Sequence, residues 1–252
     1  MTHFNVSFAT DVGMKRRQNQ DSGAALPEIG LFMVADGMGG HRGGETASSM
    51  AVAVITESVR CALQQGGSTP AKVLTEAIGA ASKAIHERAA KQPELSGMGT
   101  TTTAILFSGD TLTIGHVGDS RCYFIRPGKI WQVTRDHSLV QEKFRAGLIT
   151  RDQIKTDKLK NVITRSVGFE PSVEVEIFEM DALPGDAFML CSDGLSGLAD
   201  EKSILEVIEK RLYGENDIKS AATDLIKTAN DRGGDDNITA IIIVKDPPEQ
   251  NG

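Results

Sequence analysis

Aspartates at the ends of apolar runs are the residues of this sequence best suited to chemistry. Residues 30–35 (GLFMVA) lead into the Asp-Gly pair 36–37, and residues 186–191 (DAFMLC) lead into the pair 193–194. A single Asp-Gly pair is an ordinary turn. Several such acids at the ends of buried strands indicate a site, because distant segments converge there. The acids of this kind are Asp36, Asp119, Asp193, Asp235 and Asp236.

Clustered carboxylates would need cations. Neighbouring carboxylates repel one another and raise one another's pKa values unless a positive charge neutralises them. Oxygen donors without a nearby Cys or His pair favour a hard ion, Mg²⁺ or Mn²⁺, over zinc. An EF-hand is excluded, because no window combines the D-x-[DN]-x-[DN]-G pattern with a glutamate at its twelfth position.

Two nucleotide-binding motifs are also excluded. A strand, a glycine loop and a helix around residues 36–44 suggest a dinucleotide fingerprint, but the last glycine position of G-x-G-x-x-G holds Arg42. No Gly-Lys-Ser/Thr sequence occurs, so a P-loop is absent. What remains is an aspartate beside glycines that let the backbone approach a ligand closely.

Composition limits the class of protein. The chain has 252 residues and a formal charge of -7, which argues against a duplex nucleic acid partner. It shows neither a secretory signal nor an apolar stretch long enough to span a bilayer. The three cysteines have apolar sequence neighbours, so we expect buried free thiols, a reducing compartment and a cytoplasmic protein. These cysteines are Cys61, Cys122 and Cys191.

Periodicity predicts both strands and helices. Apolar residues at spacings of three and four predict helices over 47–62, 73–85, 204–208 and 218–229, the second after the cap pair Thr69-Pro70. We expect a helix starting near Gly44 and a hairpin through residues 118–120. Strict β-α alternation is absent, so mainly antiparallel sheets with helices packed outside are expected. The predicted strands are 30–35, 100–107, 112–117, 121–126, 173–177, 186–191 and 238–244.

One segment differs in charge from the rest. Residues 135–165 hold eight Lys or Arg residues against four acids, in a chain that is net negative. A short helix ending near Gly147 and a capping box over 150–153 are predicted there. This segment is a solvated helical insertion or a mobile flap that meets an anionic, phosphorylated partner. We call residues 135–172 the flap segment and expect it within one domain, 1–246, followed by a frayed tail, 247–252.

Together these motifs resemble the PPM family of metal-dependent protein phosphatases (the protein phosphatase 2C group), in its compact bacterial form. The matching pieces occur in the family's order and span about residues 4–244. They are residues 16–21 (RRQNQD), 34–40 (VADGMGG), 97–101 (GMGTT), 117–121 (VGDSR), 136–140 (DHSLV), 191–195 (CSDGL) and 236–239 (DNIT).

The resemblance implies a fold and a reaction. The fold would be α+β, a four-layer α/β/β/α sandwich of two mainly antiparallel sheets flanked by helices. The reaction would be hydrolysis of phosphoserine and phosphothreonine in proteins, with a hydroxide shared by two metal ions attacking phosphorus in line. The cofactors would be two tightly bound Mn²⁺ or Mg²⁺ ions and a third, weaker one.

Roles for individual residues follow from the same resemblance. Asp36 would bridge the two metals and the Gly37 carbonyl would bind one of them. Arg16 would clamp the phosphate, since a guanidinium fork matches two phosphate oxygens. The remaining implied roles are Asp193 and Asp236 as ligands of the second metal, Asp119 as the third-metal ligand, Asp21 as acceptor for metal-bound water, and Asn237 as orienter of Asp236.

The sequence departs from the family at the general acid. Eukaryotic relatives often have a histidine directly after the Asp-Gly pair, and this chain has Met38 there. His41 lies close by as a substitute, a metal-bound water is an equal alternative, and His137 is interpreted as structural. The general acid therefore stays open.

The resemblance also suggests partners. It implies phosphorylated proteins, a bacterial Ser/Thr kinase and its substrates, and a monomer, with no membrane partner. Two alternatives are a phosphatase dedicated to one regulator in a partner-switching pathway and an inactive phosphoprotein-binding scaffold. A scaffold would lack a metal aspartate, and this chain has all three of Asp36, Asp193 and Asp236.

Overall fold

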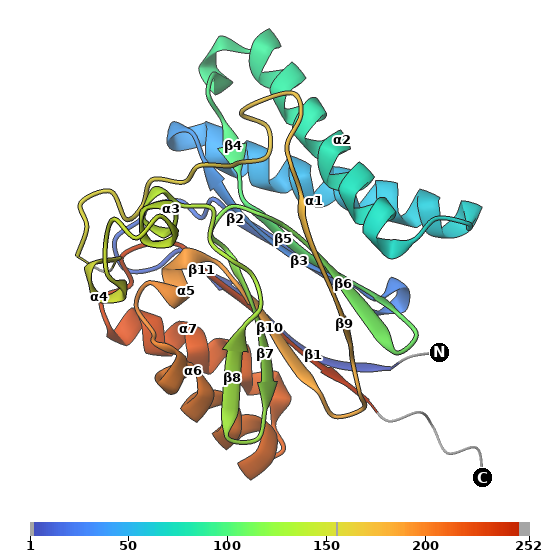
Figure 1. Cartoon of the computed structure of the whole chain (residues 1–252), viewed down its shortest axis with the longest axis vertical. Helices are drawn as coiled ribbons and strands as arrows, with labels where there is room; N and C mark the ends of the chain where they lie inside the picture. Colours follow the sequence, from blue (N-terminus) through green and yellow to red (C-terminus); the bar gives the residue numbers. More distant parts are fainter. Residues whose placement is uncertain (1–2, 155, 247–252) are drawn as a thin grey trace.

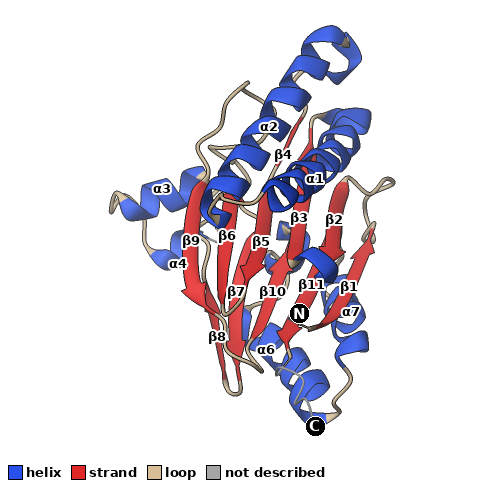
Figure 2. Ribbon diagram, turned by 90° about the vertical axis from the view of Figure 1, so that its right-hand side faces the viewer, coloured by secondary structure: helices blue, strands red, loops and turns tan. Residues whose placement is uncertain are grey.

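The computed structural model describes residues 3–154 and 156–246, apart from the side chains of His41 and Arg42. Two antiparallel sheets pack face to face between two pairs of helices (Figures 1 and 2). The strands are β1 (Phe4–Asp11), β2 (Asp21–Leu26), β3 (Leu31–Met38), β4 (Gly99–Thr100), β5 (Thr102–Ser108), β6 (Thr111–Val117), β7 (Arg121–Arg126), β8 (Lys129–Gln132), β9 (Glu176–Asp181), β10 (Ala187–Cys191) and β11 (Ile238–Lys245).

Seven α-helices and four short helical turns complete the described chain. The α-helices are α1 (Gly40–Gln65), α2 (Pro70–Lys91), α3 (Leu139–Arg145), α4 (Arg151–Ile154), α5 (Asp193–Ser196), α6 (Glu201–Ile208) and α7 (Ala221–Asp231). The turns are η1 (Pro27–Ile29), η2 (Pro93–Leu95), η3 (Glu209–Gly214) and η4 (Ile218–Ser220). Among the described residues, no helix is both long enough and apolar enough to cross a bilayer.

Strand order divides the chain between the sheets. One sheet runs β1-β11-β10-β7-β8, and the other runs β2-β3-β5-β6-β9 with β4 paired to β3. Every strand pair is antiparallel. The first and last strands are neighbours, with Phe4 opposite Lys245 and Asp11 opposite Ile238. The segment after β1 therefore leaves the sheet beside the segment that enters β11.

Three apolar cores hold the four layers together. Phe32 and Ile105 of one sheet meet Phe188 and Ile241 of the other in the central core. The long helices α1 and α2 cover the outer face of the six-stranded sheet, and α6 and α7 cover the five-stranded one (Figure 1). Side chains alternate between faces along a strand, so strands buried on both faces read as continuous apolar runs. This architecture confirms the expected α/β/β/α sandwich.

Most predicted elements are present. The helix after Thr69 is capped as expected, because the Thr69 side chain accepts a hydrogen bond from the Lys72 amide at 3.3 Å. The first long helix begins at Gly40 rather than near Gly44. The strand predicted over 173–177 begins only at Glu176, although Val173 and Val175 pack partly buried against the core. Strands β1, β2 and β8 were not predicted.

The predicted hairpin through residues 118–120 is wrong. Strand β6 pairs with β5 and β9, whereas β7 pairs with β10 and β8 in the other sheet. Gly118 has a φ of +108° and a Cβ there would lie 2.6 Å from Thr101 side-chain atoms. Glycine thus lets the chain cross between sheets, and Asp119 sits at that crossing.

One cysteine prediction is also wrong. Cys122 and Cys191 are buried free thiols as expected, but Cys61 is exposed. Its apolar sequence neighbours do not share its direction, because residues three and four apart share a helix face and adjacent ones do not. Val59 of α1 is fully buried, and Cys61 points to solvent.

The flap segment holds α3 and α4 and no strand of either sheet in its described part. Helix α3 ends at Arg145 and Gly147 follows with a φ of +71°, close to the predicted end. One of the two hydrogen bonds of the predicted capping box is present: the Thr150 amide donates to the Gln153 side chain at 2.7 Å. Near its roots, Ser138 bridges to Ile163.

We predict that Phe188→Ala destabilises the protein strongly. Phe188 is fully buried between the sheets and stacks on Phe124 at 5.3 Å, so truncation leaves a cavity. The free energy of unfolding should fall by about 3–5 kcal/mol, measured by denaturant unfolding. The control Phe169→Ala removes a ring that is 63% exposed and should change stability by about 0.5 kcal/mol or less. Equal effects would contradict this account of the core.

Candidate active site

Five predicted acids come together from five different parts of the fold. All five are buried or half-buried. Asp21 begins β2, Asp36 lies within β3, Asp119 lies in the β6–β7 crossing, Asp193 begins α5, and Asp236 precedes β11. Asp36 is not at a strand end as expected, because β3 continues to Met38 by pairing with β4.

The electrostatics of these acids show their mutual proximity. Burial raises the pKa of Asp36 well above its usual range, and the charges of Asp21 and Asp193 raise it further. Burial and then Asp193 raise the pKa of Asp119 to about 7. The pKa of Asp193 is raised by burial and by Asp236. These carboxylates cannot all be ionised together without a compensating cation.

The donor set fits a hard divalent ion. Asp21 Oδ1 and Asp193 Oδ1 are buried and have no hydrogen-bond partner in the described protein. In that same part of the chain, no three His, Cys, Asp or Glu side chains already stand close enough to hold one ion in common. The fit therefore rests on oxygen donors that lack partners, and Mg²⁺-type ions ordinarily complete such a set with water.

Two hydroxyls that sequence reasoning missed hold Asp21. Ser192 Oγ and Thr239 Oγ1 each donate to Asp21 Oδ2 at 2.7 Å. These bonds favour the ionised carboxylate, yet burial dominates and raises the pKa of Asp21 to about 6. Both hydroxyl residues lie inside motifs that the sequence analysis names, CSDG and DNIT. The feature that could have identified them is a polar residue beside an apolar strand.

The glycines of the two Asp-Gly pairs serve backbone packing. A Cβ on Gly37 would lie 2.0 Å from the Gly44 carbonyl oxygen, and one on Gly194 would lie 1.9 Å from that of Asn237. Both glycines therefore allow other backbone segments to approach closely, and the expected approach of a ligand to the Gly37 backbone stays a prediction. The second contact holds the start of α5, and with it Asp193, against the residue that follows Asp236.

Asn237 anchors the loop that carries Arg16. Its side chain accepts from the Gln20 amide at 2.8 Å and donates to the carbonyls of Val12 and Gln18 at 3.0 and 2.9 Å. Its own amide donates to Asp236 Oδ1 at 2.8 Å. Every polar atom of this side chain is used, so it fixes both the loop and the neighbouring carboxylate.

Arg16 lies at the rim of the acid cluster. Its Nη2 atom contacts Asp236 Oδ2 at 2.6 Å, and the two side chains are 51% and 36% exposed. A guanidinium here can reach an anion in the cleft because it is open to solvent. It is also paired with Asp236, which the family resemblance implies is a metal ligand.

Two histidines were considered in connection with the general acid. His41 lies in the first turn of α1, but its side chain is outside the described residues. His137 is 4% exposed and hydrogen-bonds to protein groups through both ring nitrogens, which agrees with a structural role.

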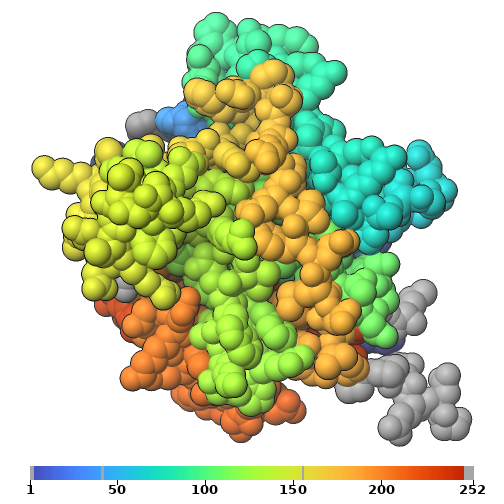
Figure 3. Space-filling model, in the orientation of Figure 1, coloured from blue at the N-terminus to red at the C-terminus, as the bar shows by residue number. Residues whose placement is uncertain are grey.

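An open cleft of about 610 Å³ adjoins the acid cluster. Asp119 and Asp193 line it on one side, and Arg151 and Lys160 of the flap segment line it on another. Lys202 of α6 lines it as well. Figure 3 shows the flap segment, in yellow-green and yellow, beside the orange surface of the residues near 200. The lining of the cleft thus contains both carboxylates and cations, with Asp136, Asp200 and Glu201 among the carboxylates.

Comparison with known proteins gives a consistent result. Residues 15–242 match the family described as "Protein phosphatase 2C". The serine/threonine phosphatase stp of Listeria monocytogenes is 34% identical over 247 residues, which is 96% of each chain. The serine/threonine protein phosphatase PstP of Mycobacterium tuberculosis is 37% identical over 92% of this chain and 43% of its own length.

Solved structures agree over nearly the whole chain. The crystal structure of the M. tuberculosis phosphatase PstP/Ppp superposes with a TM-score of 0.89 at 33% identity, covering 98% of this chain and 100% of that one. The catalytic domain of PstP in complex with two manganese ions superposes with a TM-score of 0.87, at the same identity and coverage.

We predict that stability without metal falls as pH rises. The folded-state pKa values of Asp21 and Asp119 are raised to about 6 and about 7, so between roughly pH 4 and pH 7 these two carboxyl groups bind more protons in the folded state than in the unfolded state. Each unit of such a shift is worth about 1.4 kcal/mol. In EDTA, unfolding free energy should therefore be lower at about pH 8 than at about pH 5.

Denaturant unfolding at the two pH values tests this. Asp119→Asn should flatten the decline because it removes one of the repelling charges. Added Mn²⁺ should stabilise the protein most at the higher pH, since it binds the ionised acids. Stability that rises with pH in EDTA would overturn this description of the cluster.

Proposed function

We propose that the cluster of aspartates binds two divalent cations, Mn²⁺ or Mg²⁺, because this chain belongs to the protein phosphatase 2C family. The chain is a metal-dependent serine/threonine protein phosphatase, a hydrolase of phosphoric monoesters on proteins. The observation that carries the metal proposal is the pair of buried, unpartnered carboxylate oxygens on Asp21 and Asp193.

The cation ligands would be the expected ones. Asp36 and the Gly37 carbonyl would hold one ion, and Asp36, Asp193 and Asp236 the other. Such ions, when bound, supply positive charge to the phosphoryl oxygens and a nucleophile of lowered pKa. Asp119 would hold a third, weaker ion, supported by its half-buried carboxylate and the raised pKa that a cation would relieve.

The protein's own groups bind and orient the phosphate. Arg16 would exchange its carboxylate partner for two phosphate oxygens, which is supported by its exposure and its 2.6 Å contact at the cluster rim. Asp21, held by two hydroxyls, would accept a hydrogen bond from water in the cleft. Asn237 would keep Asp236 oriented. His41 as general acid stays a prediction.

The flap segment would recognise the phosphoprotein. Arg151 and Lys160 line the cleft, and neither has a carboxylate partner among the residues that the structure describes. Unpaired cations beside the scissile phosphate favour anionic residues in the substrate. We propose phosphorylated substrates of a bacterial Ser/Thr kinase as the partners. A monomeric state, a single domain over 1–246 and a cytoplasmic location stay predictions.

Loss of a cluster aspartate should abolish turnover. We expect Asp36→Asn and Asp193→Asn to lower hydrolysis of p-nitrophenyl phosphate and of a phosphothreonine peptide by at least about 100-fold, because even groups that only orient metal ligands contribute 10–100-fold. EDTA should have the same effect and Mn²⁺ or Mg²⁺ should reverse it. Asp181→Asn, an exposed position at the end of β9, is the matched control. Full activity in the cluster variants would sink the assignment.

Removing the cleft cations should affect proteins more than small substrates. We expect the double variant Arg151→Gln and Lys160→Gln to lower kcat/KM for a phosphoprotein by about 3- to 10-fold, since exposed ion pairs are weak. Turnover of p-nitrophenyl phosphate should stay unchanged. Lys158→Gln, an exposed cation of the same segment outside the cleft lining, is the control. A loss shared equally by both substrates would argue against a recognition role.

A further inference from the structure

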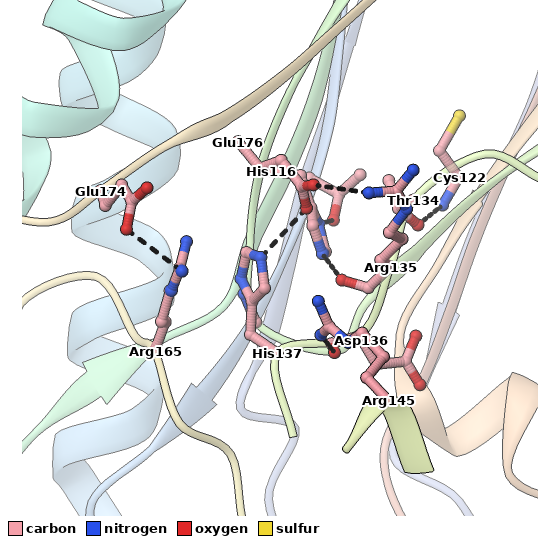
Figure 4. Close-up of polar contacts among 12 residues, drawn as sticks. His116, Cys122, Thr134, Arg135, Asp136, His137, Arg145, Arg165, Glu174 and Glu176 are labelled. Atoms are coloured by element: carbon pink, nitrogen blue, oxygen red, sulfur yellow. Dashed lines mark hydrogen bonds and ion pairs between the residues drawn. The ribbon is translucent and has the colours of Figure 1, made fainter. Parts of the chain in front are cut away.

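A buried histidine joins the acid cluster to the flap segment. His137 Nδ1 lies 3.1 Å from the Gly118 amide, and its Nε2 lies 3.2 Å from Glu176 Oε2. Figure 4 shows the imidazole between Glu176 and the segment that leads into the flap. The ring therefore touches two segments that are distant in sequence and leaves neither nitrogen free.

The partners determine where the proton sits. A backbone amide can only donate, so Nδ1 must accept and carries no proton. Nε2 then carries the proton and donates it to the Glu176 carboxylate. Burial lowers the pKa of His137, and the neighbouring ring of His116 lies at 4.7 Å between centroids, tilted by 37°. These contacts specify the neutral tautomer protonated at Nε2.

The backbone of His137 makes the same connections. Its amide donates to the Gly118 carbonyl at 2.7 Å, so residues 118 and 137 are joined in both directions. Its carbonyl accepts from Thr164, close to the other end of the flap segment, at 2.8 Å. Glu176 is the first residue of β9, directly after that segment.

We propose that His137 is a positioning residue with two arms. The Nδ1 arm fixes the Gly118 amide and thereby the crossing that carries Asp119. The Nε2 arm ties the start of the flap segment to Glu176, the backbone carbonyl of His137 holds Thr164 near the other end, and together they place the cations that this segment contributes to the cleft. The second arm's effect on substrate rests on the proposed function, whereas the tautomer and the first arm do not.

Asparagine and glutamine separate the two arms. The oxygen of His137→Asn can take the position of Nδ1 and still accept from Gly118, but this side chain is too short to reach Glu176. His137→Gln can reach Glu176 with its amide nitrogen, but it leaves the Gly118 amide without an acceptor. Both variants keep a polar side chain of similar size, so a general loss of packing would affect them alike.

The expected results differ between the variants. Amide hydrogen exchange at Gly118 should be at least about tenfold faster in His137→Gln than in His137→Asn, because a buried donor loses its partner. KM for a phosphoprotein should rise several-fold in His137→Asn, and by more than KM for p-nitrophenyl phosphate. Long-range ¹H–¹⁵N spectra of the wild-type imidazole should show the proton on Nε2.

Three outcomes would overturn the proposal. They are a proton on Nδ1 in the wild type, equal Gly118 exchange in the two variants, and an unchanged KM for the phosphoprotein in His137→Asn. The exchange rates need no turnover, so they remain decisive if the folded variants are inactive, and the wild-type spectra remain decisive even if the variants fail to fold. Wild-type protein without any phosphatase activity would instead contradict the proposed function.

Discussion

Repulsion among the buried aspartates is the constraint on which the rest of this structure depends. Five acids from five segments lie close together beside one cleft, and burial penalises the charge of four of them, Asp21, Asp36, Asp119 and Asp193. The surrounding polar groups offset only part of that cost: two hydroxyls donate hydrogen bonds to Asp21, and Arg16 forms an ion pair with Asp236. The fold therefore holds a site of high negative potential that divalent cations stabilise, at the expense of the cation-free protein.

The rigid and variable parts of the cleft have different origins. The acids are fixed by close backbone contacts, such as Gly194 against Asn237, that tolerate no side chain. Part of the cleft lining comes from the flap segment, which adds short helices and cations and contributes no strand to either sheet in its described part. In the proposed function, the sandwich would set the chemistry and the flap segment would set the choice of substrate.

Much of this organisation could be predicted from the sequence, and the failures have physical causes. Long apolar runs and helical spacing identified the central strands and the helices, and the ordered Asp-Gly motifs identified the acids. Residues 118–120 were misjudged because a glycine turn looks the same within a hairpin and between sheets, and only strand pairing distinguishes them. Ser192 and Thr239 were missed because a hydroxyl beside a strand has no signature until its acceptor, Asp21, is brought close by the fold.

The pairing of β1 with β11 has a consequence for how the molecule is made. Arg16 follows the first strand and Asp236 precedes the last, so the cleft joins segments separated by almost the whole chain. During translation, the segment with Arg16 leaves the ribosome long before the segment with Asp236. Until β11 emerges, β1 has an unpaired edge and the cluster of acids lacks Asp236. Catalytic competence therefore arrives late in synthesis, and a partly made chain is spared from acting as a phosphatase.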